Sequence, residues 1–208
     1  MGGIPRMAVE QKLPIKGTSY TAADIAIVDP EKKNGDGFAT GAMDCPWNKW
    51  LIHGLNHSHP GTKAYLSSLA ELYGEWGLDM LKVDCVFGDN YFRGSEYIPA
   101  LIDELQAKGR PMLISLSPGS AAPNATLAND MKKLAAEKKQ PIMARLTGDF
   151  WDNWQELKGH FAFAAQAEQF SSPLFSPDLD MLPMGWIAHV GTGPRFSLLT
   201  ETEQRSMM

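Results

Sequence analysis

The strongest constraint on the fold is a regular alternation of helical and strand-like segments that begins at residue 61. In each unit, apolar residues at helical spacing are followed by a short apolar run of the length of a buried strand. Helices of this length between short strands are typical of βα units, whose strands form a parallel sheet, so we expect an α/β fold. The predicted helix and strand pairs are 61–77 with 78–84, 95–109 with 110–119, and 125–140 with 141–149, followed by a helix over 150–170.

The two ends of the chain depart from this pattern. Residues 1–60 contain turn-forming residues and few sustained apolar periods, which predicts a loop-rich segment ahead of the regular part, 61–208. Near the other end, Thr200 and Glu203 fit a capping box, which predicts that a helix begins there. The total of 208 residues lies at the lower limit for a closed eight-stranded barrel, which needs about 250 and rarely fewer than about 200.

Composition and charge exclude several classes of protein. With 44% hydrophobic and 21% charged residues, the chain has the composition of a globular domain. Its 19 basic and 24 acidic residues give a net charge of -5 without a long basic run, so we expect no nucleic-acid partner. No segment approaches the roughly 18 apolar residues of a membrane helix. The N-terminus also lacks a signal-peptide pattern, so we expect no membrane partner and leave the localisation open.

Metal binding has little support in the sequence. His53, His57 and His59 lie close together, but in a predicted loop with no evident fourth ligand. Two cysteines, Cys45 and Cys85, are too few for a four-cysteine zinc site. We therefore expect no metal ion and no cofactor.

Polar residues spaced by two occur at the C-terminal ends of three predicted strands, where such residues share a face. In parallel α/β folds the functional site lies at this edge. Carboxylates at two strand ends, each near a cation, indicate an acid/base or nucleophile pair, although Asp84 and Asp149 could equally cap the helices that follow them. The polar positions are Lys82 and Asp84, Ser115 and Ser117, and Arg145, Thr147 and Asp149.

A further acidic pair lies in the segment 176–182. Asp178 and Asp180 would share one face if this segment is extended. The alternative is a polar turn after Pro177. The local sequence leaves both interpretations open.

Four segments together resemble the glycoside hydrolases of family 27, the α-galactosidase and α-N-acetylgalactosaminidase family. Residues 73–84, YGEWGLDMLKVD, resemble its W-G-(V/L)-D-x-(L/V)-K-x-D motif, and 145–154, RLTGDFWDNW, its R-x-x-x-D-x-x-D-x-W motif. Residues 177–182, PDLDML, resemble its D-P-D-M-L segment, and 199–205, LTETEQR, its L-(T/S)-x-x-E-x-(R/x) helix start. The four motifs occur in the family's order.

The resemblance implies a retaining α-glycosidase on a (β/α)8 TIM barrel, with the nucleophile ending strand four and the acid/base ending strand six. The implied reaction is hydrolysis of terminal α-galactoside-type residues by double displacement through a glycosyl-enzyme intermediate, with a carbohydrate as the partner molecule. Retaining enzymes hold the two carboxyl groups roughly 5 to 5.5 Å apart. Carried over by position, Asp84 is the nucleophile, Asp149 the acid/base, and Lys82, Arg145, Asp180 and Ser117 bind the substrate.

The same resemblance makes the length informative. If Asp84 ends strand four, residues 1–60 are too few and too irregular for three βα units of roughly 30 residues each. We therefore expect a fragment that carries about strands four to seven, with two open sheet edges, and with 1–60 as the segment that follows strand three. An inactive carbohydrate-binding or truncated remnant of such an enzyme is the alternative.

The segment after the fifth strand departs from the family pattern. Many members have a Cys-Glu-Trp or Cys-Ser-Trp segment where this chain has Ser115-Leu116-Ser117-Pro118-Gly119. Ser117 stands where the family reads the sugar's 2-substituent, so α-N-acetylgalactosaminide and β-L-arabinopyranoside specificities are alternatives. Cys45 and Cys85 could pair like the cysteines that bridge these loops in some relatives, but the spacing matches poorly. The sequence gives no indication of the oligomeric state.

Overall fold

The structure is a computed structural model, and it describes residues 2–27, 51–84, 94–117, 125–189 and 193–208. Its helices are α1 (Arg6–Glu10), α2 (Ala22–Ile25), α3 (Pro60–Glu75), α4 (Gly94–Ala107), α5 (Ala125–Lys138), α6 (Trp154–Glu168) and α7 (Glu201–Arg205). Its strands are β1 (Ile4–Pro5), β2 (Ile52–His53), β3 (Met80–Asp84), β4 (Leu113–Ser117), β5 (Ile142–Arg145), β6 (Phe175–Asp178), β7 (Trp186–His189) and β8 (Gly193–Phe196).

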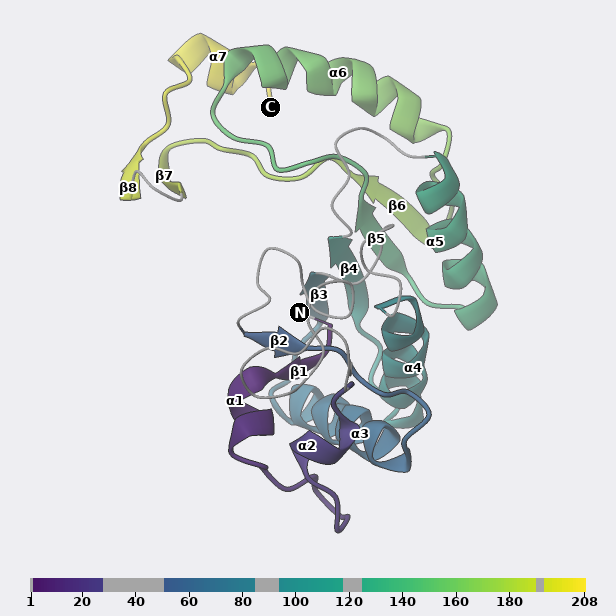
Figure 1. The fold of residues 1–208 in the computed structure, drawn as a ribbon. Coiled ribbons are helices and arrows are strands. Elements are labelled where there is room, and N and C mark those ends of the chain that lie inside the picture. The colour runs from purple at the N-terminus through teal and green to yellow at the C-terminus, as the bar shows by residue number, and fades with distance from the viewer. Residues whose placement is uncertain (1, 28–50, 85–93, 118–124, 190–192) are drawn as a thin grey trace.

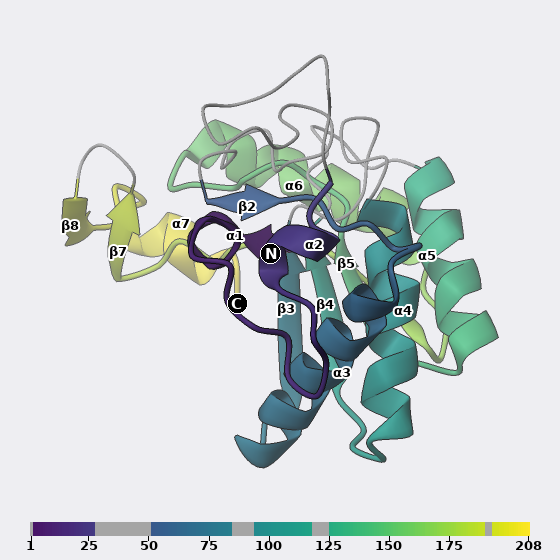
Figure 2. The same ribbon diagram turned by 60° about the horizontal axis from the view of Figure 1, so that its bottom comes forward.

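Four consecutive strands form the central sheet. They pair in chain order, β3-β4-β5-β6, and every pair is parallel. Helices α3, α4 and α5 lie along one face of this sheet (Figures 1 and 2). This arrangement confirms the predicted α/β fold and the predicted partial barrel, since neighbouring parallel strands are joined by helical crossovers.

The core lies between the sheet and these helices. The sheet contributes alternate, fully buried side chains, which include Ile114 and Leu116 of β4 and Ile142 and Ala144 of β5. Because successive strand side chains point to opposite faces, the intervening residues of the same strands face away from these helices. The helices contribute buried residues that include Leu66 and Ala70 of α3, Ile98 and Ile102 of α4, and Met131 and Ala135 of α5.

Local signals explain where α3 begins and ends. His59 is the N-cap residue, and its Nδ1 accepts a hydrogen bond of 3.1 Å from the backbone N–H of Gly61. Pro60 occupies the first helical turn, where its missing N–H costs nothing. After the helix, Gly77 adopts a positive φ of 71°, a conformation that favours glycine and stops the helix.

The ends of the chain contain more structure than the sequence predicted. In the N-terminal part, β1 pairs with β2 in antiparallel fashion, and the helices α1 and α2 lie between them in sequence. Near the C-terminus, β7 and β8 form an antiparallel hairpin that was not predicted. The capping box at Thr200 and Glu203 is present, and α7 begins there as expected. The place of residues 1–60 after a third barrel strand stays a prediction.

The predicted strand 141–149 is shorter in the structure. It ends at Arg145, and the last backbone bond toward β6 runs from Leu146 N–H to the carbonyl of Asp178, at 2.9 Å. The physical reason lies in the neighbouring strand, where Asp180 has a positive φ of 84° and leaves the extended conformation. With its partner strand ended, the chain from Leu146 to Asn153 continues as an irregular segment before α6.

In the part of the chain that the structure describes, no helix is both long and apolar enough to cross a membrane.

Candidate active site

The register of the sheet aligns four polar residues in one row at its C-terminal edge. Asp84 of β3 pairs with Ser117 of β4, and Arg145 of β5 pairs with Asp178 of β6. The β4–β5 register runs up to Leu116 with Ala144, so that Ser117 and Arg145 are the next residues in step. Neighbouring strands are about 4.8 Å apart, so the row places these side chains beside one another on one face.

The predicted pair Lys82 and Asp84 shares this face, because Lys82 pairs with Ser115 two residues before the row. Lys82 is exposed, Asp84 is half-buried, and Ser117 is buried. The carbonyl of Asp84 accepts a hydrogen bond of 2.9 Å from the N–H of Gly2, which ties the N-terminal segment to the end of β3. The backbone of Asp84 is therefore held on one side by its pairing with β4 and on the other by the bond from Gly2.

Arg145 joins two of the predicted site residues. Its Nη1 donates to Oδ1 of Asp149 at 2.7 Å and to Oδ1 of Asp180 at 3.1 Å. The Arg145 side chain is only 10% exposed, Asp180 is 1% exposed, and Asp149 is 64% exposed. The arrangement is a buried ion pair between Arg145 and Asp180, with Asp149 added at its solvent-facing end.

Charge and burial act in opposite directions on Arg145. Its burial lowers the pKa, but hydrogen bonds to Asp180 and Asp149 and the charges of both carboxylates outweigh burial and raise the pKa of the guanidinium. Arg145 therefore keeps its positive charge at every accessible pH. Within the described residues, Arg145 Nε and Thr147 Oγ1 are buried and have no hydrogen-bond partner.

Both carboxylate oxygens of Asp180 are engaged. Oδ1 accepts from Arg145, and Oδ2 accepts a short bond of 2.6 Å from the backbone N–H of Phe150. The Asp180 N–H donates to Oδ1 of Asp178 at 2.9 Å. A positive φ is uncommon for a non-glycine residue, and these bonds hold Asp180 in it. Of the two interpretations left open for residues 176–182, the extended one therefore holds only as far as Asp178, where β6 ends.

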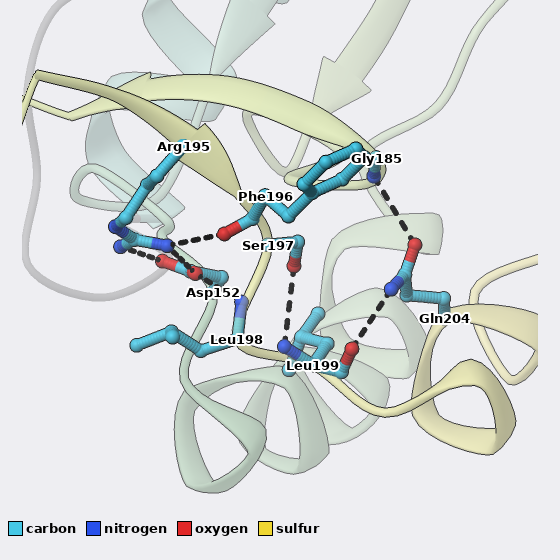
Figure 3. Close-up of polar contacts among 8 residues, drawn as sticks. All are labelled: Asp152, Gly185, Arg195, Phe196, Ser197, Leu198, Leu199 and Gln204. Atoms are coloured by element: carbon cyan, nitrogen blue, oxygen red, sulfur yellow. Dashed lines mark hydrogen bonds and ion pairs between the residues drawn. The ribbon is translucent and has the colours of Figure 1, made fainter.

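A second ion pair lies three residues beyond Asp149. The guanidinium of Arg195 forms two hydrogen bonds with the carboxylate of Asp152, one of them from Nη2 to Oδ1 at 2.9 Å. The N–H of Leu198 donates to Oδ2 of the same carboxylate at 2.6 Å (Figure 3). The hydrogen bonds from Arg195 hold the pKa of Asp152 well below its usual range, although partial burial opposes this shift.

This ion pair is not predictable from the sequence. Asp152 lies in the segment that resembles the family motif, but nothing in the sequence indicates its partner 43 residues away. Arg195 stands on β8, and the β7–β8 hairpin itself was not predicted. Only the three-dimensional fold brings the two residues together.

The three histidines of the segment 53–59 each pack against or cap neighbouring structure. His53 is fully buried in β2, His59 caps α3, and the rings of His57 and Tyr97 pack edge to face with centroids 6.4 Å apart. The described residues contain no group of three His, Cys, Asp or Glu side chains arranged to hold a metal ion. Cys45 and Cys85, whose pairing the sequence leaves open, lie outside the described residues.

The fold and this charged edge define a class: part of a (β/α)8 barrel with its polar cluster at the C-terminal ends of the strands. The model of the Alpha galactosidase A family matches residues 53–188. The chain belongs to this family, glycoside hydrolase family 27. No curated protein matches the sequence significantly.

Several solved structures match the whole chain. A family 27 β-L-arabinopyranosidase from Geobacillus stearothermophilus is 37% identical with a TM-score of 0.77, and a variant of it in complex with arabinose is 36% identical with the same score. A putative α-N-acetylgalactosaminidase from Bacillus halodurans C-125 is 32% identical with a TM-score of 0.68. Each match covers 100% of this chain and 44% of the other, so the chain spans less than half the length of these proteins.

Proposed function

We propose that this chain carries the catalytic carboxylates of a retaining glycosidase that hydrolyses terminal galactoside-type sugars. The observation that carries the proposal is the row at the C-terminal edge, in which Asp84 stands in register with Ser117 and Arg145 binds Asp149. Family membership supports it, because both aspartates lie within the matched range 53–188 and in segments that resemble the family motifs.

In the proposed reaction, the carboxylate of Asp84 attacks the anomeric carbon while Asp149 gives its proton to the departing glycosidic oxygen. The bond to the leaving group breaks, and a glycosyl ester on Asp84 forms. Asp149 then accepts a proton from water, which attacks the same carbon and releases Asp84. The exposure of Asp149, at 64% of its side chain, is compatible with a group that must meet both the leaving group and water.

Lys82, Ser117, Arg145 and Asp180 are proposed to form the sugar site. Lys82 lies two residues before Asp84 on the same face of β3 and adds a positive charge there. The Asp180 carboxylate balances the charge of the Arg145 guanidinium, so that Asp149 can hold a proton without leaving this cation unpaired. Because only 1% of its side chain is exposed, Asp180 acts at this site through its ion pair with Arg145.

A β-L-arabinopyranoside is the second candidate substrate, because it has the ring hydroxyl pattern of a galactoside without the exocyclic CH2OH group. One observation favours it, the likeness of the chain to a β-L-arabinopyranosidase.

The test compares kcat/KM of the full-length protein for aryl α-D-galactopyranoside, aryl β-L-arabinopyranoside and aryl α-N-acetylgalactosaminide. We expect the protein to hydrolyse the first two substrates, and we expect NMR to show that the first-formed product retains the anomeric configuration of the substrate. Inversion would overturn the double displacement. Failure to hydrolyse any of the three, with binding of free arabinose preserved, would instead support the inactive carbohydrate-binding alternative.

A further inference from the structure

The segment that carries Asp149 lacks support from strand pairing. Backbone pairing toward β6 ends at the Leu146 N–H, and α6 begins only at Trp154. Side-chain hydrogen bonds hold the chain between them: Arg145 binds Asp149, Asp180 binds the Phe150 N–H, and Asn153 caps α6 through its bond to the Gln155 N–H. The position of Asp149 therefore depends on side-chain hydrogen bonds.

Asp152 provides the fourth and most extensive anchor. Its carboxylate accepts two bonds from Arg195 and one from the Leu198 N–H, and its side chain is 4% exposed. Paired N–H donors of a guanidinium match the two oxygens of a carboxylate and fix orientation as well as distance. Asp152 lies three residues from Asp149, so this orientation is transmitted through a very short stretch of backbone.

The partner side of the anchor is the β7–β8 hairpin. Among the described strands, β7 and β8 pair only with each other and not with the central sheet. Arg195 also donates to the carbonyl of Phe196 at 3.0 Å, and the hairpin is linked to α7 through the Gly185 N–H and Gln204 Oε1, at 3.1 Å (Figure 3). Asp152 thus joins the acid/base segment to a separate two-stranded unit.

We propose that Asp152 and Arg195 are positioning residues for Asp149, and that they hold its carboxyl group at the distance from the leaving group that proton transfer requires. This inference rests on the proposed function, in which Asp149 is the acid/base. A misplacement of about 1 Å at a reacting group can cost about 100-fold in rate. A buried charged pair offers little net stability over apolar packing, which makes orientation its main contribution.

The test uses the leaving-group dependence of the full-length protein and its Asp152→Asn variant. The dinitrophenolate leaving group of a dinitrophenyl glycoside departs without a proton. The alcohol of an alkyl glycoside of the same sugar departs only when the acid protonates its oxygen. We expect kcat/KM of Asp152→Asn to fall about 10- to 100-fold for the alkyl glycoside and to change little for the dinitrophenyl glycoside. Azide, which attacks the glycosyl ester without base assistance, should raise kcat of the variant with the dinitrophenyl substrate.

Two further variants separate positioning from folding. Arg195→Lys keeps the charge but loses the planar fork, so it should show the same selective loss even if Asp152→Asn does not fold. Asp103→Asn removes the partner of Lys138 in an exposed pair between α4 and α5, at 2.6 Å, and should leave both substrates unaffected.

Equal losses on both substrates, or none, in Arg195→Lys would overturn the positioning role. If the wild-type protein hydrolysed neither glycoside, the proposed function would fail and the positioning role with it.

Discussion

The two candidate catalytic carboxylates reach the same edge of the sheet by different means. Asp84 is the last residue of β3, where its register with Ser117 and the bond from Gly2 fix the backbone. Asp149 lies four residues beyond the end of β5, in an irregular segment held by the side chains of Arg145, Asp180 and Asp152. One carboxylate is placed by backbone pairing, the other by a set of ion pairs.

The difference shows how a sheet edge can combine a fixed group with an adjustable one. Backbone pairing does not depend on the identity of any one side chain, so the place of Asp84 tolerates substitution around it. The place of Asp149 depends on individual charged groups that can each be removed by one mutation. In the proposed mechanism this suits the roles, because Asp84 forms a bond at one atom, whereas Asp149 serves the leaving group and then water.

The largest expected effect is at Asp84, the carboxylate at the end of β3. Asp84→Asn in the full-length protein should reduce turnover below detection, because an amide is too weak a nucleophile to displace the leaving group. Its thermal unfolding should match that of the wild type, because the backbone pairing of β3 is unchanged. Asp130→Asn on the exposed surface of α5 is the matched control. Substantial turnover by Asp84→Asn would show that the nucleophile is another group.

The second effect is on stability and concerns the ion pair between Arg145 and Asp180, which supports Asp149. Asp180→Ala should lower the free energy of unfolding by about 3 to 5 kcal/mol, because it removes the buried partner of the Arg145 guanidinium and leaves it the exposed Asp149. Urea unfolding measures this change. Asp103→Ala removes an exposed pair with Lys138 and should cost only about 0 to 1 kcal/mol. Similar losses in the two variants would mean that Arg145 does not depend on Asp180.

The same contrast explains what could be predicted from the sequence. The βα alternation and the period of two placed Lys82, Asp84, Ser115 and Ser117 on one face of parallel strands, and the sheet has them there. These features are local, because periodicity and strand register follow from neighbouring residues. The capping box at Thr200 was predictable for the same reason.

The features that were not predictable arise from contacts between distant segments. The early end of β5 depends on the positive φ of Asp180 and on its bond to the Phe150 N–H, 30 residues away in sequence. The pairing of Asp152 with Arg195 spans 43 residues and depends on a hairpin with no strong local signal. Charged residues have many possible partners in a sequence, and the folded chain selects one of them.

The third prediction concerns pH and tests whether the Asp152 pair contributes to stability. The pKa of Asp152 is lowered in the folded protein, so its contribution is complete above the unfolded pKa of about 3.9 and is lost as the pH falls toward the folded pKa. We expect the difference in unfolding free energy between wild type and Asp152→Asn to be constant above about pH 5 and to shrink below about pH 4. A constant difference down to about pH 3 would contradict this account.

The smallest expected effect is at Thr200, the N-cap residue of α7. The Thr200 Oγ1 accepts from the Glu203 N–H at 3.3 Å, and the Thr200 N–H donates to Glu203 Oε2 at 2.7 Å, which together start α7. Met207, just beyond α7, packs against the cluster that contains Phe150, the neighbour of Asp149. Thr200→Ala should cost about 1 kcal/mol, as typical N-cap removals do, and should raise amide hydrogen exchange in α7.

Thr21→Ala provides the matched control, because Thr21 and Asp24 form an equivalent capping box at α2 in the N-terminal segment. Both variants should lose a similar free energy of unfolding, since each removes one N-cap hydroxyl. Only Thr200→Ala should loosen the region around Phe150 and thereby slow hydrolysis of glycosides that need the acid. If both variants slowed it equally, general destabilisation would explain the loss, and the contrast between a carboxylate placed by a strand and one placed by side chains would not extend to α7.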